Sequence, residues 1–402
     1  MGDQIYEIKD LSEAQKNIIK ASVPILQKSG EALTANFYSY MLESYPEVRP
    51  FFNKSDQKNL RQPRILAYAL LNYAKNIDDL GPLSGFVNDI VSKHVGLQVK
   101  PEHYPIVGSC LIATMGKMLG STIANTDFVD AWSTAYGNLA QILINAESEK
   151  YKLNTWDGFR EFRVTRIVNE AENVKSVYFT PTDGGKVQIP QRGQYVCIRW
   201  KVPGSDSETS REYSLSQFPL SNEYRISVRL LDQGMISEYV HKQMPINTII
   251  RVAPPSGLFI YQNNNEANDL VIYAGGIGIT PLISIIDFAL KKGRTVKMFY
   301  SNKLVEQRPF SDWFLKLKRE NPDIFFLTEF FSQEKDNEIQ AIDRIVARRL
   351  QPLDIDCVDF SKTHDFYLLG PRGYMKFVRK ELQNRGVKES DIFSEVFGPL
   401  DV

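Results

Sequence analysis

The stretch Leu83-Ser-Gly-Phe-Val-Asn-Asp-Ile-Val-Ser-Lys-His94 decides how the first part of the chain folds. As a helix, it places one apolar stripe along its length: Leu83, Phe86, Val87, Ile90 and Val91. His94 takes the next position on that stripe. A neutral histidine there is either a core residue bonded to a backbone carbonyl or a ligand to a metal in an apolar pocket, such as haem iron. The stretch alone leaves both interpretations open.

The sequence around this stretch is helical from Ser12 to about Tyr151, because apolar residues recur at three- and four-residue spacing and no good strand candidate occurs. Three polar side chains fall on apolar stripes of these helices, namely Gln62, Tyr104 and Glu147. Gln62 either caps its helix or points into a pocket. Taken alone, Tyr104 could be a core residue with its hydroxyl at the surface, and Glu147 could lie at a solvated helix end.

Together with their neighbours, these residues form a joint pattern. It comprises Tyr38, Phe52, Gln62, Leu66, Lys93-His94, Lys100-Pro-Glu-His-Tyr104, Ala131-Trp132, Ala135-Tyr136 and Glu147. The pattern resembles a globin, specifically the globin module of the flavohaemoglobins, over about the first 150 residues. The resemblance implies haem b, with His94 as the proximal iron ligand and Phe52 packed on the haem. Tyr38 and Gln62 would donate hydrogen bonds to bound dioxygen, and Leu66 would shape that distal pocket.

The resemblance also implies roles on the proximal side of the haem. Tyr104 and Glu147 would bond around His94 and make it a stronger electron donor to the iron. Lys93, next to the ligand in the sequence, is expected to tune the haem potential.

The pattern changes near Trp156-Asp-Gly-Phe159, where helical periodicity stops and short β-rich runs begin. The predicted strands, separated by turn residues, are 162–168, 174–180, 194–200, 213–217 and 224–231. Many short strands at this density favour an antiparallel barrel or sandwich.

Two local patterns in this segment carry chemistry. In Arg211-Glu212-Tyr213-Ser214, the arginine suits a phosphate, the tyrosine can stack on a flat heterocycle and the serine can donate a hydrogen bond. In Gly234-Met-Ile-Ser237, a glycine opens a predicted helix whose N-terminus favours a phosphate. The simpler alternatives are an exposed strand arginine and a capped surface helix.

From Asp269 onward, strands and helices alternate, which predicts a parallel doubly wound sheet. Strands are expected at 270–274, 296–300, 324–331 and 366–369, with helices up to 290 and at 311–319, 341–350 and 374–385. The first turn is Ala274-Gly-Gly276-Ile277-Gly278-Ile279-Thr280-Pro281. It is not G-x-G-x-x-G, because a proline replaces the third glycine, but a strand, a glycine turn and a helix still favour phosphate binding.

These two segments together resemble the flavin and NAD(P)H domains of the ferredoxin-reductase superfamily. The likeness extends to Gly193-Gln-Tyr195, Ala253-Pro-Pro-Ser-Gly257, Leu369-Gly-Pro371 and Glu395-Val396-Phe397-Gly398-Pro399. It implies that Tyr195 and the 211–214 run hold FAD, that 234–237 lies under its pyrophosphate, and that 276–281 receives NAD(P)H. The 395–399 segment would cover the flavin, with Glu395 close to it.

The order globin, flavin barrel, nicotinamide domain is that of the flavohaemoglobins, with predicted domains at 1–151, 155–262 and 268–402. The resemblance implies hydride transfer from NAD(P)H to FAD and single-electron transfer from FAD to the haem. The implied activity is nitric oxide dioxygenase, in which haem-bound dioxygen converts nitric oxide to nitrate. Two alternatives remain: a haem–flavin reductase of hydroperoxides or quinones, and an oxygen sensor or store with a built-in reductase.

Composition argues against several other classes of protein. Lys plus Arg and Asp plus Glu both number 48, so the basic excess of a nucleic-acid binder is missing. We expect no apolar run that spans a bilayer and no signal peptide. The three cysteines are far apart in the sequence, which fits a reducing compartment. The expectation is a cytoplasmic monomer without a membrane anchor, acting on dioxygen and nitric oxide.

Overall fold

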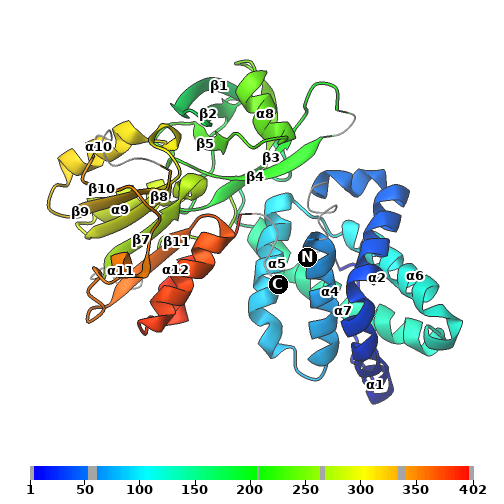
Figure 1. The fold of residues 1–402 in the computed structure, drawn as a ribbon. Helices are drawn as coiled ribbons and strands as arrows, with labels where there is room; N and C mark the ends of the chain where they lie inside the picture. Colours follow the sequence, from blue (N-terminus) through cyan, green and yellow to red (C-terminus); the bar gives the residue numbers. More distant parts are fainter. Residues whose placement is uncertain (1–3, 53–60, 206–207, 263–267, 334–340, 398–402) are drawn as a thin grey trace. The chain divides into compact units, whose positions relative to one another are not determined.

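The structure is a computed structural model that describes residues 4–52, 61–205, 208–262, 268–333 and 341–397 (Figure 1). These residues form two compact units. The first contains the N-terminal helices through Phe159 together with 199–211, and the second contains 160–198 and 212–397. The second unit therefore holds most of the middle segment and all of the described residues from 268 to 397. The predicted domain boundaries near 151–155 and 262–268 stay predictions.

The N-terminal segment is helical, as the apolar periodicity predicts. Its helices are α1 (Glu13–Ala21), α2 (Val23–Ser44), α4 (Arg61–Lys75), α5 (Ser84–Leu97), α6 (His103–Ile123) and α7 (Thr126–Tyr151), with 3₁₀ turns η1 (Pro46–Phe51) and η2 (Gly81–Leu83). A capping box between Ser12 and Gln15 starts α1, and the Asn125 side chain caps α7 by accepting from the Phe128 backbone N–H. Phe37, Leu111 and Trp132 are buried in one core shared by α2, α6 and α7.

Helices α2 and α4 approach each other closely because small residues lie where they cross. A Cβ added at Gly30 would lie 3.4 Å from the Cβ of Ala67. One turn later on α2, the Thr34 hydroxyl donates to the Pro63 carbonyl at 2.7 Å. Pro63 lies in the first turn of α4, where its missing N–H breaks no helical hydrogen bond. The next turn of α2 carries Tyr38, so this crossing sets where that side chain lies.

Helix α6 corrects one expectation from the sequence. It has 21 residues, contains a stretch of mean hydropathy 1.4, and is long and apolar enough to cross a membrane by length and composition alone. It is the one such helix among the residues that the structure describes. Of that stretch, 28% is buried. Its inward residues Cys110, Leu111 and Met115 pack in the helical core. Core helices of water-soluble domains meet the same criteria, so the helix by itself assigns no membrane role.

The middle segment folds as a six-stranded sheet that closes on itself. Its elements are β1 (Arg160–Ala171), β2 (Val174–Pro181), β3 (Tyr195–Trp200), β4 (Thr209–Ser214), β5 (Tyr224–Arg229), α8 (Met235–Lys242) and β6 (Ile249–Val252), and the strand order is β4-β3-β6-β1-β2-β5. An antiparallel bridge between Leu215 and Ile226 joins the chain after β4 to β5, the opposite edge. The barrel, rather than the sandwich, is therefore formed.

Two details of the barrel differ from the predicted strands. The fourth strand ends at Ser214 instead of continuing to Gln217, because Leu215 leaves β4 to make the closing bridge. Strand β6 was not predicted, since it has four residues and gives too short an alternation to detect. It pairs antiparallel with β1, where Val252 lies opposite Arg160.

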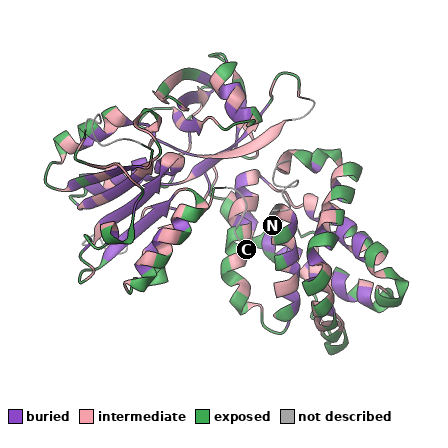
Figure 2. Cartoon of the chain, in the orientation of Figure 1, coloured by how far each residue is buried: buried purple, intermediate pink, exposed green. Residues whose placement is uncertain are grey.

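The last segment is a parallel doubly wound sheet, as predicted. Its strands are β7 (Asp269–Gly275), β8 (Val296–Asn302), β9 (Phe325–Phe331), β10 (Arg344–Val346), β11 (His364–Leu369) and β12 (Ile392–Ser394), in the order β10-β9-β8-β7-β11-β12. The helical elements are η3 (Gly276–Ile279), α9 (Leu282–Lys291), η4 (Val305–Gln307), α10 (Ser311–Glu320), α11 (Pro352–Ile355), α12 (Arg372–Asn384) and η5 (Glu389–Asp391). Figure 2 shows these strands largely buried. One apolar cluster joins the sheet to α9 and α10, and another joins it to α11 and α12.

The helix predicted at 341–350 is wrong. The chain there forms the short strand β10, with Ile345 paired to Glu329 of β9. The Asp343 carboxylate accepts from the Leu327 backbone N–H at 3.0 Å, which fastens the segment to the sheet edge. The β-branched pair Ile345-Val346 suits this extended edge better than a helix.

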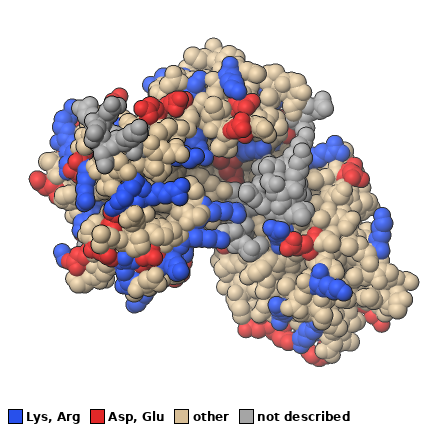
Figure 3. All heavy atoms as spheres, in the orientation of Figure 1, with Lys and Arg blue, Asp and Glu red and all other residues tan. Residues whose placement is uncertain are grey.

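Charged side chains of both signs occur on the face of the molecule drawn in Figure 3. This distribution accompanies equal numbers of basic and acidic residues in the sequence. A basic excess is typical of nucleic-acid binding proteins, so the balanced charge of the sequence does not favour that function.

Close packing of α6 on α7 generates a test of the helical unit. A Cβ at Gly108 would lie 2.5 Å from a Tyr136 ring carbon, and that ring is held by its hydroxyl, which donates to the Tyr104 carbonyl at 2.7 Å. We expect Gly108→Ala to lower the free energy of unfolding by about 1–3 kcal/mol, measured by urea unfolding followed by circular dichroism.

The matched control is Gly116→Ala on the same helix, where nothing lies within 4 Å of the added Cβ. Alanine favours a helix over glycine by about 1 kcal/mol, so this variant should be neutral or more stable. Equal unfolding midpoints for both variants would contradict the packing argument.

Candidate functional site

Three predicted side chains from three helices meet in the helical unit. His94 of α5, Tyr104 of α6 and Glu147 of α7 form a triangle. Its sides are 2.8 Å from His94 Nδ1 to Glu147 Oε1, 2.6 Å from the Tyr104 hydroxyl to Glu147 Oε1, and 3.1 Å from that hydroxyl to His94 Nδ1. Glu147 is 1% exposed and Tyr104 is 6% exposed. Glu147 therefore does not lie at a solvated helix end, and the Tyr104 hydroxyl is not at the surface.

The hydrogen-bond donors and acceptors of the triangle define the state of the histidine. The Tyr104 hydroxyl donates to Glu147, and an ionised carboxylate can only accept, so Nδ1 of His94 carries a proton and donates as well. In the neutral imidazole, a proton on Nδ1 leaves the lone pair on the opposite nitrogen, Nε2, which is the form that binds a metal. A single histidine would hold haem iron, because the macrocycle would supply most of the other ligands of the metal.

Burial keeps the tyrosine in its donating form. The pKa of Tyr104 is raised far above its ordinary value, first by burial and then by the neighbouring charge of Glu147. The hydroxyl therefore stays protonated at every physiological pH. The hydrogen bond from Tyr104 to the carboxylate therefore keeps its donor over that range.

The end of α5 is held by residues that were not predicted. Gln98 ends the helix in the left-handed conformation, with φ of 60°. Its side-chain nitrogen donates to the Val95 carbonyl at 2.7 Å, and its oxygen accepts from the Gly158 N–H at 3.0 Å. The Tyr151 hydroxyl donates to the Val99 carbonyl at 2.6 Å. These contacts fix the turn that carries His94, and only the position of Gln98 after an apolar stripe hints at them in the sequence.

The predicted distal residues lie along α2, η1 and α4. The ring centroids of Tyr38 and Phe52 are 5.5 Å apart, and both rings are half-buried against the core that also contacts Leu66. Burial raises the pKa of Tyr38, so its hydroxyl remains a neutral donor. Gln62 is half-buried in the first turn of α4. Lys93 is half-buried beside His94 in the sequence.

In the barrel, predicted flavin contacts converge around Tyr195. This residue is 4% exposed and exchanges two backbone hydrogen bonds of 2.9 Å with Ser256. Its pKa is raised first by burial, then by the charges of Glu212 and Glu395. A Cβ at Gly257 would lie 2.9 Å from the Tyr195 ring and 3.7 Å from a Glu395 carboxylate oxygen. The C-terminal segment thus reaches the barrel where the resemblance places the flavin.

The remaining barrel residues keep their predicted elements. Arg211 and Tyr213 are half-buried on β4, and Ser214 is buried at its end. Gly234 precedes α8, and a Cβ there would lie 2.4 Å from the Ser237 hydroxyl oxygen. That hydroxyl donates to the Gly234 carbonyl at 3.0 Å. This bond is not a helix cap, because a cap accepts from backbone N–H groups and α8 has no side-chain cap. The phosphate role of this turn stays a prediction.

The glycine turn after β7 lies at the point where the strand order reverses. Strand β8 flanks β7 on one side and β11 on the other, and ligands of such sheets bind at this crevice. A Cβ at Gly278 would lie 2.8 Å from the Leu369 carbonyl, and one at Gly275 would lie 2.8 Å from Pro371. Side chains are excluded at both positions, which brings the ends of β7 and β11 together.

Two hydrogen bonds to backbone carbonyls hold the turn in its conformation. Gly276 has φ of +53°, and its carbonyl accepts from the Tyr300 hydroxyl at 3.0 Å. The Thr280 hydroxyl donates to the Ile277 carbonyl at 3.0 Å. The other predicted residues of the turn, Gly278, Ile279 and Pro281, are buried.

Arg229 is a candidate phosphate-binding residue that the sequence pattern did not reveal. It ends β5 of the barrel, and its Nη1 lies 3.4 Å from the position of a Cβ at Gly276. A guanidinium at a glycine turn supplies the positive charge that a phosphate requires. Within the predicted strand 224–231 nothing distinguishes Arg229, because its partner lies about 50 residues away and is supplied by tertiary structure.

At the C-terminus, Val396 is half-buried against the apolar cluster of α12, and Phe397 is 45% exposed. Gly398 and Pro399 lie outside the described residues.

Comparisons with known proteins agree with this arrangement. Three family models match in order: Globin over residues 35–143, Oxidoreductase FAD-binding domain over 161–261, and Oxidoreductase NAD-binding domain over 272–380. The chain is 51% identical to a flavohemoprotein of Candida albicans over 399 residues, covering 98% of this chain and 99% of that one.

Solved structures show the same fold. A flavohemoglobin from Malassezia yamatoensis, with bound FAD and heme, is similar with a TM-score of 0.85 and 24% identity, covering 97% of this chain and 100% of that one. The FAD/NAD-binding domain of a nitric oxide dioxygenase from Vibrio cholerae is similar with a TM-score of 0.53 and 28% identity, covering 60% and 99%.

Fold and site define an oxidoreductase in which a globin is joined to a flavin- and nicotinamide-binding module. The chain belongs to the flavohemoprotein family. Its cofactors are haem, FAD and a nicotinamide dinucleotide. A globin joined to a reductase suggests small gaseous ligands.

The triangle predicts the outcome of removing its histidine. We expect His94→Ala to lose the haem absorption band because no iron ligand remains on α5. Flavin content and NAD(P)H oxidation by ferricyanide should persist, because the second unit contributes neither bond to His94. A variant that retains a wild-type haem spectrum would show that His94 is not the ligand.

Proposed function

We propose that the chain is an NAD(P)H- and dioxygen-dependent nitric oxide dioxygenase used in nitric oxide detoxification. When bound, haem supplies dioxygen binding and oxidation of nitric oxide to nitrate, and FAD divides the hydride of NAD(P)H into single electrons. Nitric oxide and dioxygen give nitrate by taking up one electron, so each NAD(P)H supports two turnovers. The likeness to the reductase part of a Vibrio cholerae nitric oxide dioxygenase supports this proposal.

The observation that carries the proposal is the bond from His94 Nδ1 to the buried Glu147 carboxylate. A carboxylate that accepts this hydrogen bond increases the basicity of the imidazole more than a neutral backbone carbonyl would. The lone pair on Nε2 then donates more electron density to a bound metal, and such donation favours activation of dioxygen. Because Glu147 is 1% exposed, solvent screens this effect little.

Tyr38 distinguishes the proposed enzyme from an oxygen store. Burial raises the pKa of Tyr38, so its hydroxyl stays protonated and can donate a hydrogen bond beside the ring of Phe52. A hydrogen bond to bound dioxygen slows its release, whereas a store must release it quickly. A dedicated electron supply in the same chain also serves turnover more than storage. We extend the proposal to a cytoplasmic monomer, since the globin and its reductase need no separate protein partner.

The first experiment is a visible spectrum of the purified protein, followed by NADH-driven nitric oxide consumption in air. We expect haem and flavin bands, and nitrate formed in proportion to the nitric oxide consumed. Turnover of hydroperoxides or quinones without nitric oxide consumption would favour the alternative reductase instead.

Replacing the distal donor tests the role of Tyr38. We expect Tyr38→Phe to release dioxygen about ten-fold faster, which corresponds to one lost hydrogen bond of ~1.4 kcal/mol, and to consume nitric oxide more slowly. Flash photolysis and a nitric oxide electrode measure the two effects. Tyr40→Phe, at a 47% exposed tyrosine on the same helix, is the control and should match wild type. Unchanged nitric oxide consumption in Tyr38→Phe would refute this mechanism.

Replacing the carboxylate tests the proximal bond. We expect Glu147→Gln to slow nitric oxide consumption by about 10–100-fold, as is typical for groups that orient a metal ligand, and to raise the haem reduction potential. The potential should rise because a neutral amide stabilises oxidised iron less. Spectroelectrochemical titration measures it. Glu149→Gln, at an exposed position two residues along α7, should change neither quantity; equal potentials in all three proteins would exclude an electronic role for Glu147.

A further inference from the structure

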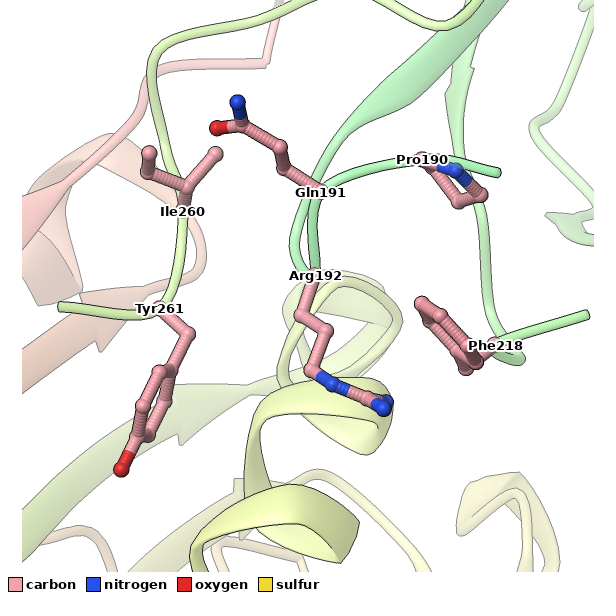
Figure 4. A pocket seen from close by; sticks show the side chains of 6 residues that line it. All are labelled: Pro190, Gln191, Arg192, Phe218, Ile260 and Tyr261. Atoms are coloured by element: carbon pink, nitrogen blue, oxygen red, sulfur yellow. The ribbon is translucent and has the colours of Figure 1, made fainter. Parts of the chain in front are cut away.

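Arg192 lies between two aromatic rings that belong to different parts of the second unit. Its guanidinium carbon is 3.7 Å from the ring centroid of Phe218 and 4.4 Å from that of Phe288. Phe218 belongs to the barrel segment after β4, and Phe288 belongs to α9 of the parallel sheet. Figure 4 shows the Arg192 side chain extending toward a helix, beside the ring of Phe218. The arginine therefore links the barrel to the nicotinamide-binding fold.

The backbone around Arg192 fits the same helix closely. Arg192 Nη1 donates to the Ser284 carbonyl at 3.4 Å, in the first turn of α9. The next residue, Gly193, has φ of +106°, and a Cβ there would lie 2.4 Å from the Phe259 carbonyl and 3.2 Å from Ile285. Only glycine permits this approach. The contact therefore depends on the backbone conformation at Gly193 as well as on the side chains that stack.

Each side of this contact leads within a few residues to a candidate cofactor site. On the barrel side, Arg192 precedes Tyr195 by three residues, and Phe218 follows Ser214 by four. On the other side, α9 begins directly after the glycine turn 276–281. A shift of α9 against the barrel would therefore move the dinucleotide site relative to the flavin site.

We propose that Arg192 is a positioning residue for hydride transfer, which holds α9 and its glycine turn at a fixed place against the flavin barrel. The inference rests on the flavin-reduction half of the proposed function and is independent of nitric oxide chemistry. The hydride leaves the nicotinamide carbon with its electron pair and joins the flavin, so its rate depends steeply on the distance between the two rings. A planar guanidinium stacks on both rings at once, which a lysine ammonium cannot do.

Electrostatics are consistent with a half-buried clamp. Burial lowers the pKa of Arg192, and the nearby charge of Asp287 on α9 opposes that effect. Asp287 itself accepts from the Trp313 indole N–H at 3.0 Å, so its position is fixed. Other contacts, such as the Gln262 N–H to the Tyr367 hydroxyl at 2.8 Å, also join the barrel to the sheet. Loss of the clamp should therefore shift α9 without unfolding the unit.

The test is anaerobic stopped-flow reduction of the bound flavin by NADH in the full holoprotein, without nitric oxide. We expect Arg192→Met to lower the rate constant per bound FAD at saturating NADH by about ten-fold. The apparent affinity for NADH should change less than the rate does, which separates positioning from binding. NADH deuterated at the transferred hydrogen should show an isotope effect that depends more strongly on temperature than in wild type.

Two further variants support the comparison. Phe288→Leu should slow flavin reduction in the same way, and Arg192→Lys should fall between wild type and Arg192→Met. Arg166→Met is the matched control, because the Arg166 guanidinium carbon also lies 3.7 Å from a ring centroid, that of Tyr178, but both residues belong to the barrel. It should reduce flavin at the wild-type rate.

The outcomes separate clearly. If Arg192→Met and Phe288→Leu reduce their bound flavin at the wild-type rate with an unchanged isotope effect, Arg192 has only a structural role and the proposal is overturned. If Arg192→Met does not fold, Phe288→Leu and Arg192→Lys give the same decision. A failure of nitric oxide consumption in wild type would refute the proposed function and leave this measurement intact.

Discussion

A carboxylate buried to 1% exposure constrains how three helices of the helical unit pack together. An ionised carboxylate away from water is unfavourable unless charged or polar donors surround it. Glu147 receives these donors from Tyr104 and His94 on two other helices, at 2.6 and 2.8 Å. The ends of α5, α6 and α7 must therefore stay in register. The same requirement turns Nε2 of His94 away from the carboxylate.

The second unit depends on a different constraint: glycines occupy the positions where a side chain would keep two segments apart. Gly275, Gly278 and Gly370 allow the ends of β7 and β11 to touch, and Gly193 allows the barrel to reach α9. Two arginines lie beside these close contacts. Arg229 reaches the glycine turn from β5, and Arg192 stacks against α9. Backbone proximity and positive charge are the two properties that a dinucleotide phosphate site requires.

The sequence supports these conclusions unequally, for physical reasons. A polar residue on an apolar stripe is a local signal that singles out His94 and Glu147 without the fold. Their roles came only from the joint pattern with Tyr104 and the family that it resembles. Barrel closure was left open because it rests on the bridge between Leu215 and Ile226, which no local pattern encodes. The helix predicted at 341–350 is wrong because the chain there pairs with β9, a partner that the local pattern does not encode. Arg229 and Arg192 escaped notice because their significance lies in partners distant in sequence. The cofactor roles of the individual residues stay predictions until variants are measured.

The buried tyrosines connect the chemistry of the site to the stability of the fold. Burial raises the pKa of Tyr38, Tyr104 and Tyr195 above the ordinary value of 10.0. Between that value and the raised ones, an unfolded chain loses these protons while the folded chain keeps them. The unfolded state then binds fewer protons, so stability falls as pH rises through this window. Below pH about 10 the tyrosines are protonated in both states and impose no such penalty. The Tyr104 hydroxyl that donates to Glu147 and the Tyr38 hydroxyl beside Phe52 therefore stay protonated under physiological conditions. Only alkaline pH removes tyrosine protons, first from the unfolded chain, and their loss there lowers the stability of the fold.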